Sequence, residues 1–265
     1  MYMKMYSAWI ITIGNELLIG KIINTNASWL ARRLTLLGYN VNRIVVIPDN
    51  LNDIAETFRE AVNKNIDIVI STGGLGPTFD DKTSEGLALA FNKKLVINED
   101  ALKMVREKYV RKGWKLTESR IKMAKLPENA IPIKNHTGTA PGIFLKVNDT
   151  YIISLPGVPV EMKVMFDFEV INILKKRASK YYYSEAELTC KGLPESGIAP
   201  IVKDVMDRFR NVYIKSHPRC SELGQLIITI HVTSFGKSRS EADKNVSKAV
   251  AELKELLGKL GGKIS

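Results

Sequence analysis

Short apolar runs alternate with longer amphipathic segments along the first two thirds of the chain. Each run is rich in β-branched residues and apolar at successive positions, which is typical of strands buried on both faces of a sheet. These predicted strands cover residues 8–13, 41–47, 67–72 and 151–155. Apolar residues recur at helical spacing in segments 26–37, 53–63, 81–91, 101–112 and 159–174. Strands that alternate with helices imply right-handed crossovers, so we expect an α/β fold with a mainly parallel sheet.

The pattern changes after the basic stretch Lys175–Arg177. From there on, strands are expected at 185–191, 212–216 and 225–234, and helices at 196–209 and 241–257. The order β-α-β-β-α within about 85 residues is typical of a small α+β domain. We therefore predict two domains, residues 1–174 and residues 175–265.

Composition and charge narrow the class of protein. Hydrophobic residues make up 45% of the chain and charged residues 25%, which is ordinary for a soluble globular protein. No apolar run approaches the ~20 residues that span a bilayer, and the start of the chain does not resemble a secretory signal. We therefore expect a cytoplasmic protein without a membrane partner.

The net charge of +11 is uneven, with +4 in residues 1–170 and +7 in the remainder. A basic excess raises the prospect of an anionic partner such as a nucleotide or RNA. The lysines are scattered through amphipathic segments, however, and a solvated surface explains them better. Nucleic acid is therefore not the expected partner.

Two cysteines, Cys190 and Cys220, are 30 positions apart. Two cysteines alone cannot form a zinc site, and they do not indicate the disulfide framework of a secreted protein. We expect two small buried residues, while a bridge between them stays an alternative.

Glycine-containing motifs follow three of the predicted strands. They are Gly14–Glu16 after the first strand, Thr72–Pro77 after the third and Pro156–Pro159 after the late one. In an open parallel sheet, ligands bind outside the carboxyl ends of the strands. The three loops are therefore expected to converge on one pocket.

The segment Thr72–Thr83 carries the strongest single signal. Its glycines let backbone N–H groups approach an anion, and the helix that follows offers its positive N-terminal end. Neither the Walker loop nor the dinucleotide-binding Gly-x-Gly-x-x-Gly spacing is present. A phosphate or a carboxylate would fit there; a tight strand–helix turn without a ligand, its helix capped by an aspartate, is the alternative.

Acidic and amide side chains lie beside these loops. Asp80 and Asp81 at the predicted helix start can hold a divalent cation with bridging phosphates, although one of them would serve equally as a helix cap. Glu16 is expected to face the same pocket, with Asn26 as a polar anchor, and Asn24 or Thr25 is expected to cap the adjoining helix. Covalent catalysis is disfavoured, because no Ser-His-Asp arrangement or cysteine nucleophile stands out.

A further polar loop precedes the late strand, at His136–Gly142. Its backbone is expected to line the pocket, with Thr139 contacting phosphate. His136 is more simply a solvated loop residue than a ligand or a base, because no two histidines in the chain have metal-ligand spacing.

The complete set of motifs resembles the CinA family of the molybdopterin-binding-like superfamily, which includes MogA, MoaB and the gephyrin domains. The resemblance covers about residues 6–174, with every motif in order. It rests on five segments: Ile13–Gly20, Thr25–Asn26, Thr72–Pro77 followed by Asp80, Asp81 and Thr83, Gly138–Gly142, and Leu155–Met162.

The resemblance implies a three-layer, doubly wound α/β domain that binds a nucleotide or pterin phosphate. CinA-type domains are associated with pyrophosphatase activity that depends on a divalent metal ion (Mg²⁺, Mn²⁺ or Co²⁺). Relatives in the superfamily form dimers or trimers, so a homo-oligomer is expected. Members often carry a nicotinamide-mononucleotide deamidase domain, which residues 175–265 do not resemble.

Carried over position by position, the resemblance implies catalytic and metal-binding roles for Asp81, Asp80 and Glu16. Asn15 occupies a position that is often Asp, which leaves one carboxylate fewer. The implied substrate-binding residues are Gly14, Asn15, Asn26, Thr72, Gly73, Gly74, Leu75, Gly76, Thr83, Gly138, Thr139, Ala140, Pro156, Gly157, Pro159, Glu161 and Lys163.

The leading hypothesis is a metal-dependent nucleotide pyrophosphatase that hydrolyses ADP-ribose or FAD to AMP and the other phosphate half. The alternatives are an adenylyltransferase-like molybdopterin-binding protein of molybdenum cofactor biosynthesis, and a non-catalytic nucleotide- or RNA-binding module.

Overall fold

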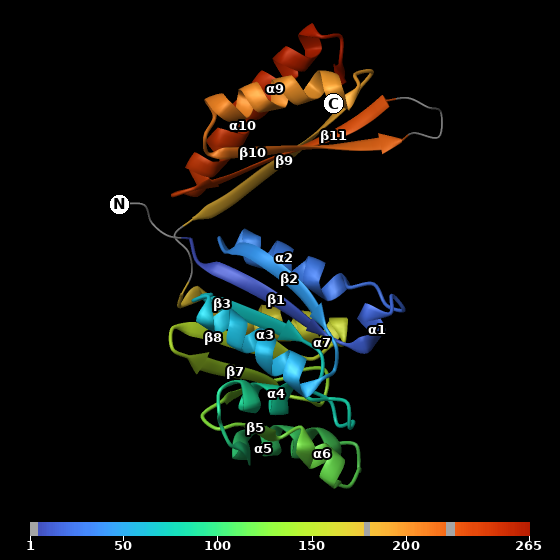
Figure 1. Ribbon diagram of the computed structural model, residues 1–265, viewed down its shortest axis with the longest axis vertical. Helices are drawn as coiled ribbons and strands as arrows, with labels where there is room; N and C mark the ends of the chain where they lie inside the picture. The colour runs from blue at the N-terminus through green and yellow to red at the C-terminus, as the bar shows by residue number, and fades with distance from the viewer. Residues whose placement is uncertain (1–4, 178–180, 221–225) are drawn as a thin grey trace. The chain divides into compact units, whose positions relative to one another are not determined.

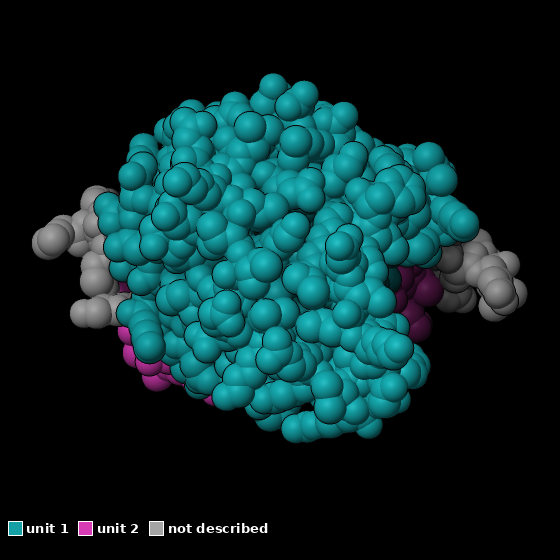
Figure 2. Space-filling view, turned by 90° about the horizontal axis from the view of Figure 1, so that it is seen from below, with its two compact units in different colours: residues 1–35, 39–178 teal, residues 36–38, 179–265 magenta. Residues whose placement is uncertain are grey.

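The computed structural model describes residues 5–177, 181–220 and 226–265. The chain divides into two compact units, residues 1–35 with 39–178 and residues 36–38 with 179–265. Figure 1 shows the elements of both units, and Figure 2 gives each unit its own colour. The observed division falls after residue 178, a few residues beyond the predicted boundary after residue 174.

The first unit is built on a six-stranded sheet of order β2-β1-β3-β8-β7-β6. Its parallel strands are β1 (Ser7–Ile13), β2 (Asn40–Ile47), β3 (Ile68–Thr72) and β8 (Thr150–Leu155). The last two strands on one side, β7 (Gly142–Val147) and the edge strand β6 (Ile131–Ile133), run antiparallel, which the sequence did not predict. The expected mostly parallel α/β fold is confirmed.

Helices lie on both faces of this sheet. They are α1 (Asn15–Leu18), α2 (Thr25–Leu36), α3 (Leu51–Asn63), α4 (Thr83–Ala90), α5 (Glu99–Val110), α6 (Glu118–Lys122), α7 (Pro159–Met165) and α8 (Ile171–Lys175). The π-helical turn η1 (Phe166–Val170) joins α7 to α8, so the predicted helix 159–174 is one helical run with a widened turn. A short antiparallel pair, β4 (Leu95–Ile97) and β5 (Lys125–Pro127), completes the unit.

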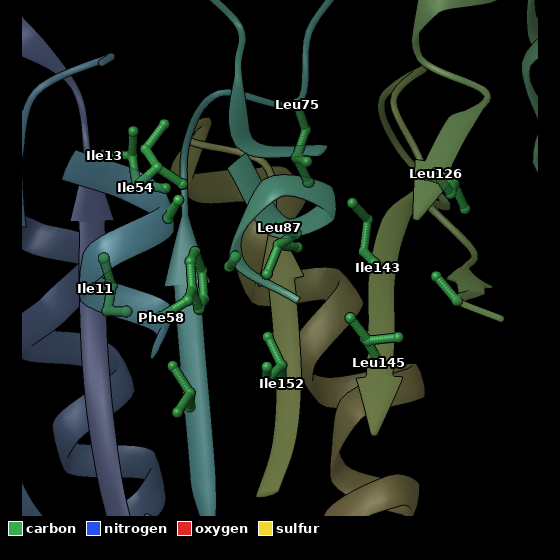
Figure 3. Packing of buried hydrophobic residues seen from close by; sticks show 14 of the residues in the cluster. Ile11, Ile13, Ile54, Phe58, Leu75, Leu87, Leu126, Ile143, Leu145 and Ile152 are labelled. Carbon is green, nitrogen blue, oxygen red and sulfur yellow. The ribbon is translucent and has the colours of Figure 1, made fainter. Parts of the chain in front are cut away.

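A large hydrophobic core fills the space between one face of the sheet and helices α3 and α4. Phe58 of α3 and Leu87 of α4 are fully buried against Ile11, Ile143 and Ile152 of the strands (Figure 3). The opposite face carries a separate contact, in which Trp29 of α2 meets Phe166 of η1 edge to face at 5.3 Å. Packing on both faces explains why the central strands are buried along almost their whole length.

The second unit has its own sheet of order β10-β11-β9-β12. Its elements are β9 (Tyr182–Lys191), α9 (Glu195–Arg208), β10 (Val212–Cys220), β11 (Leu226–Gly236), α10 (Arg239–Lys259) and β12 (Lys263–Ile264). The expected β-α-β-β-α order is present with β12 added as an edge strand, and every pairing is antiparallel.

Both helices of the second unit contribute to one hydrophobic cluster with its strands. Within that cluster Cys190 is a buried, free thiol, and burial raises its pKa. The side chain of Cys220 lies outside the described residues. No helix in the described ranges is long and apolar enough to cross a membrane.

Candidate functional site

The loops that follow β1, β3 and β8 surround one pocket of about 600 Å³, as predicted from the positions of their motifs. The loop that precedes β7 contributes Thr139 and Ala140 to the same wall. The predicted residues that line the pocket are Gly14, Glu16, Asn26, Thr72, Gly73, Gly74, Leu75, Gly76, Asp80, Asp81, Thr139, Ala140, Pro156, Gly157, Pro159 and Glu161.

Four predicted residues lie outside this lining. Thr83 is fully buried, and its hydroxyl donates to the Gly73 carbonyl at 2.8 Å, so it shapes the loop from behind. Gly138 donates its N–H to Asn135 Oδ1 at 2.7 Å. Lys163 points toward Trp29, with its Nζ 5.9 Å from the ring centroid. The backbone N–H of Asn15 donates to Asp49, a residue that lines the pocket.

The glycine loop after β3 passes directly over the end of β1. Gly73 has a φ of 105°, and a Cβ at this position would lie 2.1 Å from the carbonyl oxygen of Ile13. Only glycine permits both this backbone conformation and this approach. In the described ranges the N–H groups of Gly74, Leu75 and Gly76 have no hydrogen-bond acceptor. Successive unpaired N–H groups beside a pocket make an anion-binding surface.

Asp80 and Asp81 converge on the Thr78 hydroxyl. Its oxygen lies 2.5 Å from one carboxylate oxygen of each aspartate, and the same Asp81 oxygen accepts the Thr78 N–H at 2.9 Å. A hydroxyl has one proton to donate, so Thr78 can donate to only one of the two carboxylates at a time. Two carboxylates this close to each other repel, and a cation would offset that repulsion.

The surroundings of Asp80 lower its pKa. The hydrogen bond from Thr78 is the main cause, followed by its own backbone N–H and by Lys122 and Lys82. Neither aspartate caps the helix that follows: α4 begins at Thr83, Lys82 stands at its N-cap, and no side chain caps it. The alternative that one of these acids is a helix cap is therefore wrong, although one oxygen of each carboxylate accepts from Thr78 within the loop.

Two further carboxylates stand across the pocket. Glu16 folds back over Gly14, where a Cβ would lie 2.6 Å from its Oε1. Asp49, at the carboxyl end of β2, accepts the Asn15 N–H at 2.8 Å and lines the pocket. Burial raises the pKa of Asp49, and the negative charges of Glu16, Asp80 and Asp81 add to the effect.

Asp49 is the functional candidate that the sequence reasoning missed. It stands in a Pro-Asp-Asn turn, which accounts for the residue without a function. The signal was nonetheless available, because the turn follows a predicted parallel strand and strand ends were already the criterion for the other loops.

No three His, Cys, Asp or Glu side chains in the described parts of the chain are grouped as a ready-made metal site. Mg²⁺ is commonly held by only one or two carboxylates, with substrate phosphates and water completing its octahedron. The pair Asp80 and Asp81 fits a cation that arrives with a phosphate ligand. The divalent metal stays a prediction.

Amide side chains hold the remaining loops in place. Asn24 Oδ1 accepts the Ala27 N–H at 3.1 Å and so caps α2, while its Nδ2 donates to Thr12 at 2.9 Å. Asn26 is buried and donates to the Gly157 carbonyl at 2.7 Å. On the opposite wall Glu161 accepts from Asn135 at 2.7 Å. These bonds fix the β1 and β8 loops around the cavity.

Raising the pH is expected to reveal how much the ionised, partly buried Asp49 carboxylate destabilises the folded protein. Its folded-state pKa is raised above the ordinary 3.8, so ionisation disfavours the folded state as the pH rises through that raised pKa. Asp49→Asn, which retains an acceptor for Asn15, should therefore stabilise the protein at neutral pH. The gain should disappear below the unfolded pKa, where wild-type Asp49 is protonated in both states. Thermal unfolding at pH 3 to 8 measures it, and a gain that grows as the pH falls would contradict it.

Comparison with known proteins bears on the same part of the chain. Residues 9–176 match the family described as "Probable molybdopterin binding domain". A protein of Pyrobaculum aerophilum is 50% identical over 250 residues, 94% of each chain. A protein of Sulfurisphaera tokodaii is 46% identical over 262 residues, 99% of each chain.

Among solved structures, the crystal structure of "the protein CinA with unknown function" from Thermoplasma acidophilum aligns with a TM-score of 0.60 and 45% identity. It covers 64% of this chain and 98% of that one. A more distant structure, the molybdopterin biosynthesis Mog protein of Mycobacterium ulcerans, aligns with a TM-score of 0.44 and 20% identity over 65% of this chain and 99% of that one.

Proposed function

The chain belongs to the CinA-like family of molybdopterin-binding domains, and on that premise we propose that its pocket binds a phosphorylated pterin or adenine nucleotide. The observation that carries the proposal is the glycine loop, whose unpaired N–H groups at residues 74–76 stand beside the two converging aspartates. Unpaired donors suit phosphate oxygens, and the carboxylates suit a cation that accompanies them.

The reaction class proposed for this site is attack on the α-phosphorus of an adenine nucleotide. In adenylyl transfer the acceptor is the phosphate of molybdopterin, ATP is the donor, and pyrophosphate leaves. In hydrolysis the acceptor is water, ADP-ribose or FAD is the substrate, and AMP is one product. The two reactions place the same phosphorus against the glycine loop and differ in the acceptor and in the group that leaves: pyrophosphate from ATP, or the other phosphate half of ADP-ribose or FAD. Membership of the molybdopterin-binding family favours the first reaction.

One feature of the pocket favours hydrolysis as the second candidate. Four carboxylates border the same cavity, and Asp49 has a raised pKa, so it is a suitable acceptor for the proton of an attacking water. Asp80 and Asp81 would hold a divalent cation, which when bound would neutralise phosphate charge and lower the pKa of a coordinated water. The N–H groups of the glycine loop would bind the charge that develops on the phosphoryl oxygens.

Product analysis tests the proposal. The protein is incubated with ADP-ribose, FAD or ATP in the presence of Mg²⁺, Mn²⁺ or Co²⁺, and AMP and pyrophosphate are followed by chromatography; AMP binding is measured by calorimetry. Asp81→Asn is expected to lower turnover about 100-fold, the order of loss for removing one preorganised electrostatic contact in an active site, here a carboxylate that would hold the cation. Asp53→Asn is the matched control, because Asp53 is exposed on α3 and outside the pocket lining.

The outcomes separate the candidates. AMP formed from ADP-ribose or FAD, and lost in Asp81→Asn, supports hydrolysis. Saturable AMP binding without hydrolysis supports the molybdopterin-binding, adenylyl-transfer assignment. A protein that neither binds nor turns over any of these compounds would contradict both candidates.

A further inference from the structure

One face of the second unit's sheet has no helix of that unit on it. The side chains that pack with α9 and α10 come from even-numbered positions of the strands, such as Leu188 of β9, Ile214 of β10 and Ile230 of β11. Figure 1 shows both helices on the same side of the sheet. Successive residues of a strand point to opposite faces, so the odd-numbered residues of these strands point away from the helices. We call the surface formed by the odd-numbered residues of β9, β10 and β11, together with Lys263 of β12, the open face.

Basic side chains cross one end of the open face. The register partners from β10 through β11 and β9 to β12 are Arg219, Ile227, Lys191 and Lys263. The three charged residues are exposed, and Ile227 is half-buried between Arg219 and Lys191. Lys191 and Lys263 stand directly opposite each other, and like charges in that position destabilise a sheet. An anion bound across these residues, which we call the basic row, would offset that repulsion.

Aromatic side chains occupy the other end of the open face. Tyr213 of β10 is 57% exposed. Phe235 of β11 and Tyr183 of β9 are register partners, and their ring centroids lie 5.2 Å apart. Tyr213 pairs with Thr233, the residue of the open face that precedes Phe235 on β11. Arg219 follows Tyr213 by six positions on β10, so the rings and the basic row lie roughly 20 Å apart along the strands.

The acidic side chains of the open face have partners on the same face. Glu187 pairs with Arg219 at 3.8 Å, and Glu185 lies 3.0 Å from the Nε2 atom of His231. The basic residues of this face that make no ion pair within the described ranges are Lys191, Lys215 and Lys263. The open face therefore carries a positive charge and has ammonium groups available for a ligand.

Aromatic rings and unpaired cations on one surface suit a ligand that carries flat rings and negative charges in one chain. An acidic peptide would match the charges without requiring the rings, and a duplex keeps its bases stacked inside. Single strands present both bases and phosphates, and proteins bind them by stacking bases on aromatic side chains beside a basic surface. A four-stranded sheet with aromatic residues on its exposed face is one of the structures that bind RNA in this way.

From these observations we propose that the open face binds single-stranded RNA. Bases would stack on Tyr213 and Phe235, and phosphates would contact the basic row and Lys215. The exposed His217, between Lys215 and Arg219 on β10, would hydrogen-bond a 2′-hydroxyl. The total charge of the sequence did not indicate this partner, whereas the gathering of charges and rings on one face does. The site lies in the second unit, so the proposal does not depend on the function proposed for the pocket.

Fluorescence anisotropy tests the proposal. Labelled oligonucleotides of about 10 nucleotides, within the usual site size for single strands, are titrated with the full chain at several salt concentrations. Single-stranded RNA should bind with an affinity that falls as the salt concentration rises. The DNA counterpart of the same sequence and the double-stranded RNA should each bind at least about threefold more weakly, because DNA lacks the 2′-hydroxyl and the duplex hides its bases.

Matched variants locate the site. Lys191→Gln should weaken RNA binding about threefold, the order of one exposed ion pair, and reduce the slope of log K against log salt by about 0.7. Lys248→Gln is the control, because it removes the same charge from an exposed position on α10, and it should change neither quantity. Tyr213→Ala should weaken binding about tenfold, an ordinary loss for one stacked base, and leave the slope unchanged. Tyr213→Phe keeps the ring and should bind as the wild type does.

Several results would overturn the proposal. Single-stranded RNA that does not bind, or a duplex that binds as tightly, would contradict the open face as a site for single strands. DNA that binds as tightly as RNA would contradict the choice of RNA. Equal losses in Lys191→Gln and Lys248→Gln would show that only the total charge attracts RNA, and an unaltered affinity in Tyr213→Ala would show that no base stacks there. None of these results bears on ligand binding in the pocket of the first unit.

Discussion

Gly73→Ala is expected to abolish ligand binding and to lower the free energy of unfolding of the first unit by about 4 kcal/mol, the sum of a strained backbone and a steric overlap. At a φ of 105° an alanine is strained, and its Cβ would lie 2.1 Å from the Ile13 carbonyl oxygen. A backbone atom cannot swing aside as a side chain can. The loop must lift from β1, which takes the N–H groups of residues 74–76 away from the anion.

Gly20→Ala separates the strain from the overlap. Gly20 also has a positive φ, of 71°, but a Cβ there would meet nothing within 4 Å. It should cost about 1–2 kcal/mol, the ordinary penalty for the left-handed conformation, and leave binding intact. Chemical denaturation and AMP calorimetry on both variants measure the two effects. Equal losses of stability in Gly73→Ala and Gly20→Ala would show that the approach to Ile13 carries no energetic weight.

Phe58→Ala is expected to cost about 3–5 kcal/mol, the range for emptying a buried aromatic site. Phe58, which Figure 3 labels, projects from α3 toward the sheet and is fully buried. The side chains around Phe58 come from strands and from α4. Because these elements hold each other in place, the side chains can move only partly into the cavity that the substitution leaves. The loss should therefore approach the total free energy of unfolding of an ordinary domain, which is about 5–15 kcal/mol.

The placement of tryptophan makes this loss measurable in one unit alone. Trp9, Trp29 and Trp114, the three tryptophans of the chain, all belong to the first unit. Tryptophan fluorescence during urea denaturation therefore follows the unfolding of that unit and not of the second. Phe79→Ala is the control, since 90% of Phe79 is exposed, and it should change stability by less than about 0.5 kcal/mol. Similar midpoints for both variants would contradict the burial argument.

The parallel strands and the pocket could be predicted because each produces a recognisable pattern in the local amino-acid sequence. Residues of β3 are buried without exception, and a strand buried on both faces has no polar alternation to obscure it. Parallel strands place their carboxyl ends at one edge of the sheet, so the glycine loops could be brought together without any knowledge of their contacts. The position of Asp81 beside Gly76 follows from the same placement.

The remaining features depend on contacts that no local pattern encodes. The edge strand β6 has only three residues and contains Pro132, so it carries neither length nor alternation, and it is recognisable only from its pairing with β7. Lys163 was expected in the pocket because it follows a family motif on a helix. The direction of its side chain is instead set by Trp29, which belongs to a helix more than 100 residues earlier in the chain.

The hydrophobic cluster around Phe58 and the cluster of the second unit have no residue in common. A domain with its own core holds the information for its own folding. In evolutionary terms, each unit can therefore be inherited as a separate module. Recombination can exchange, duplicate or remove one unit without disturbing the hydrophobic core of the other. Selection can also set a different rate of sequence change in each unit. The pocket lies wholly within the first unit, so its chemistry can persist in lineages whose second units have diverged.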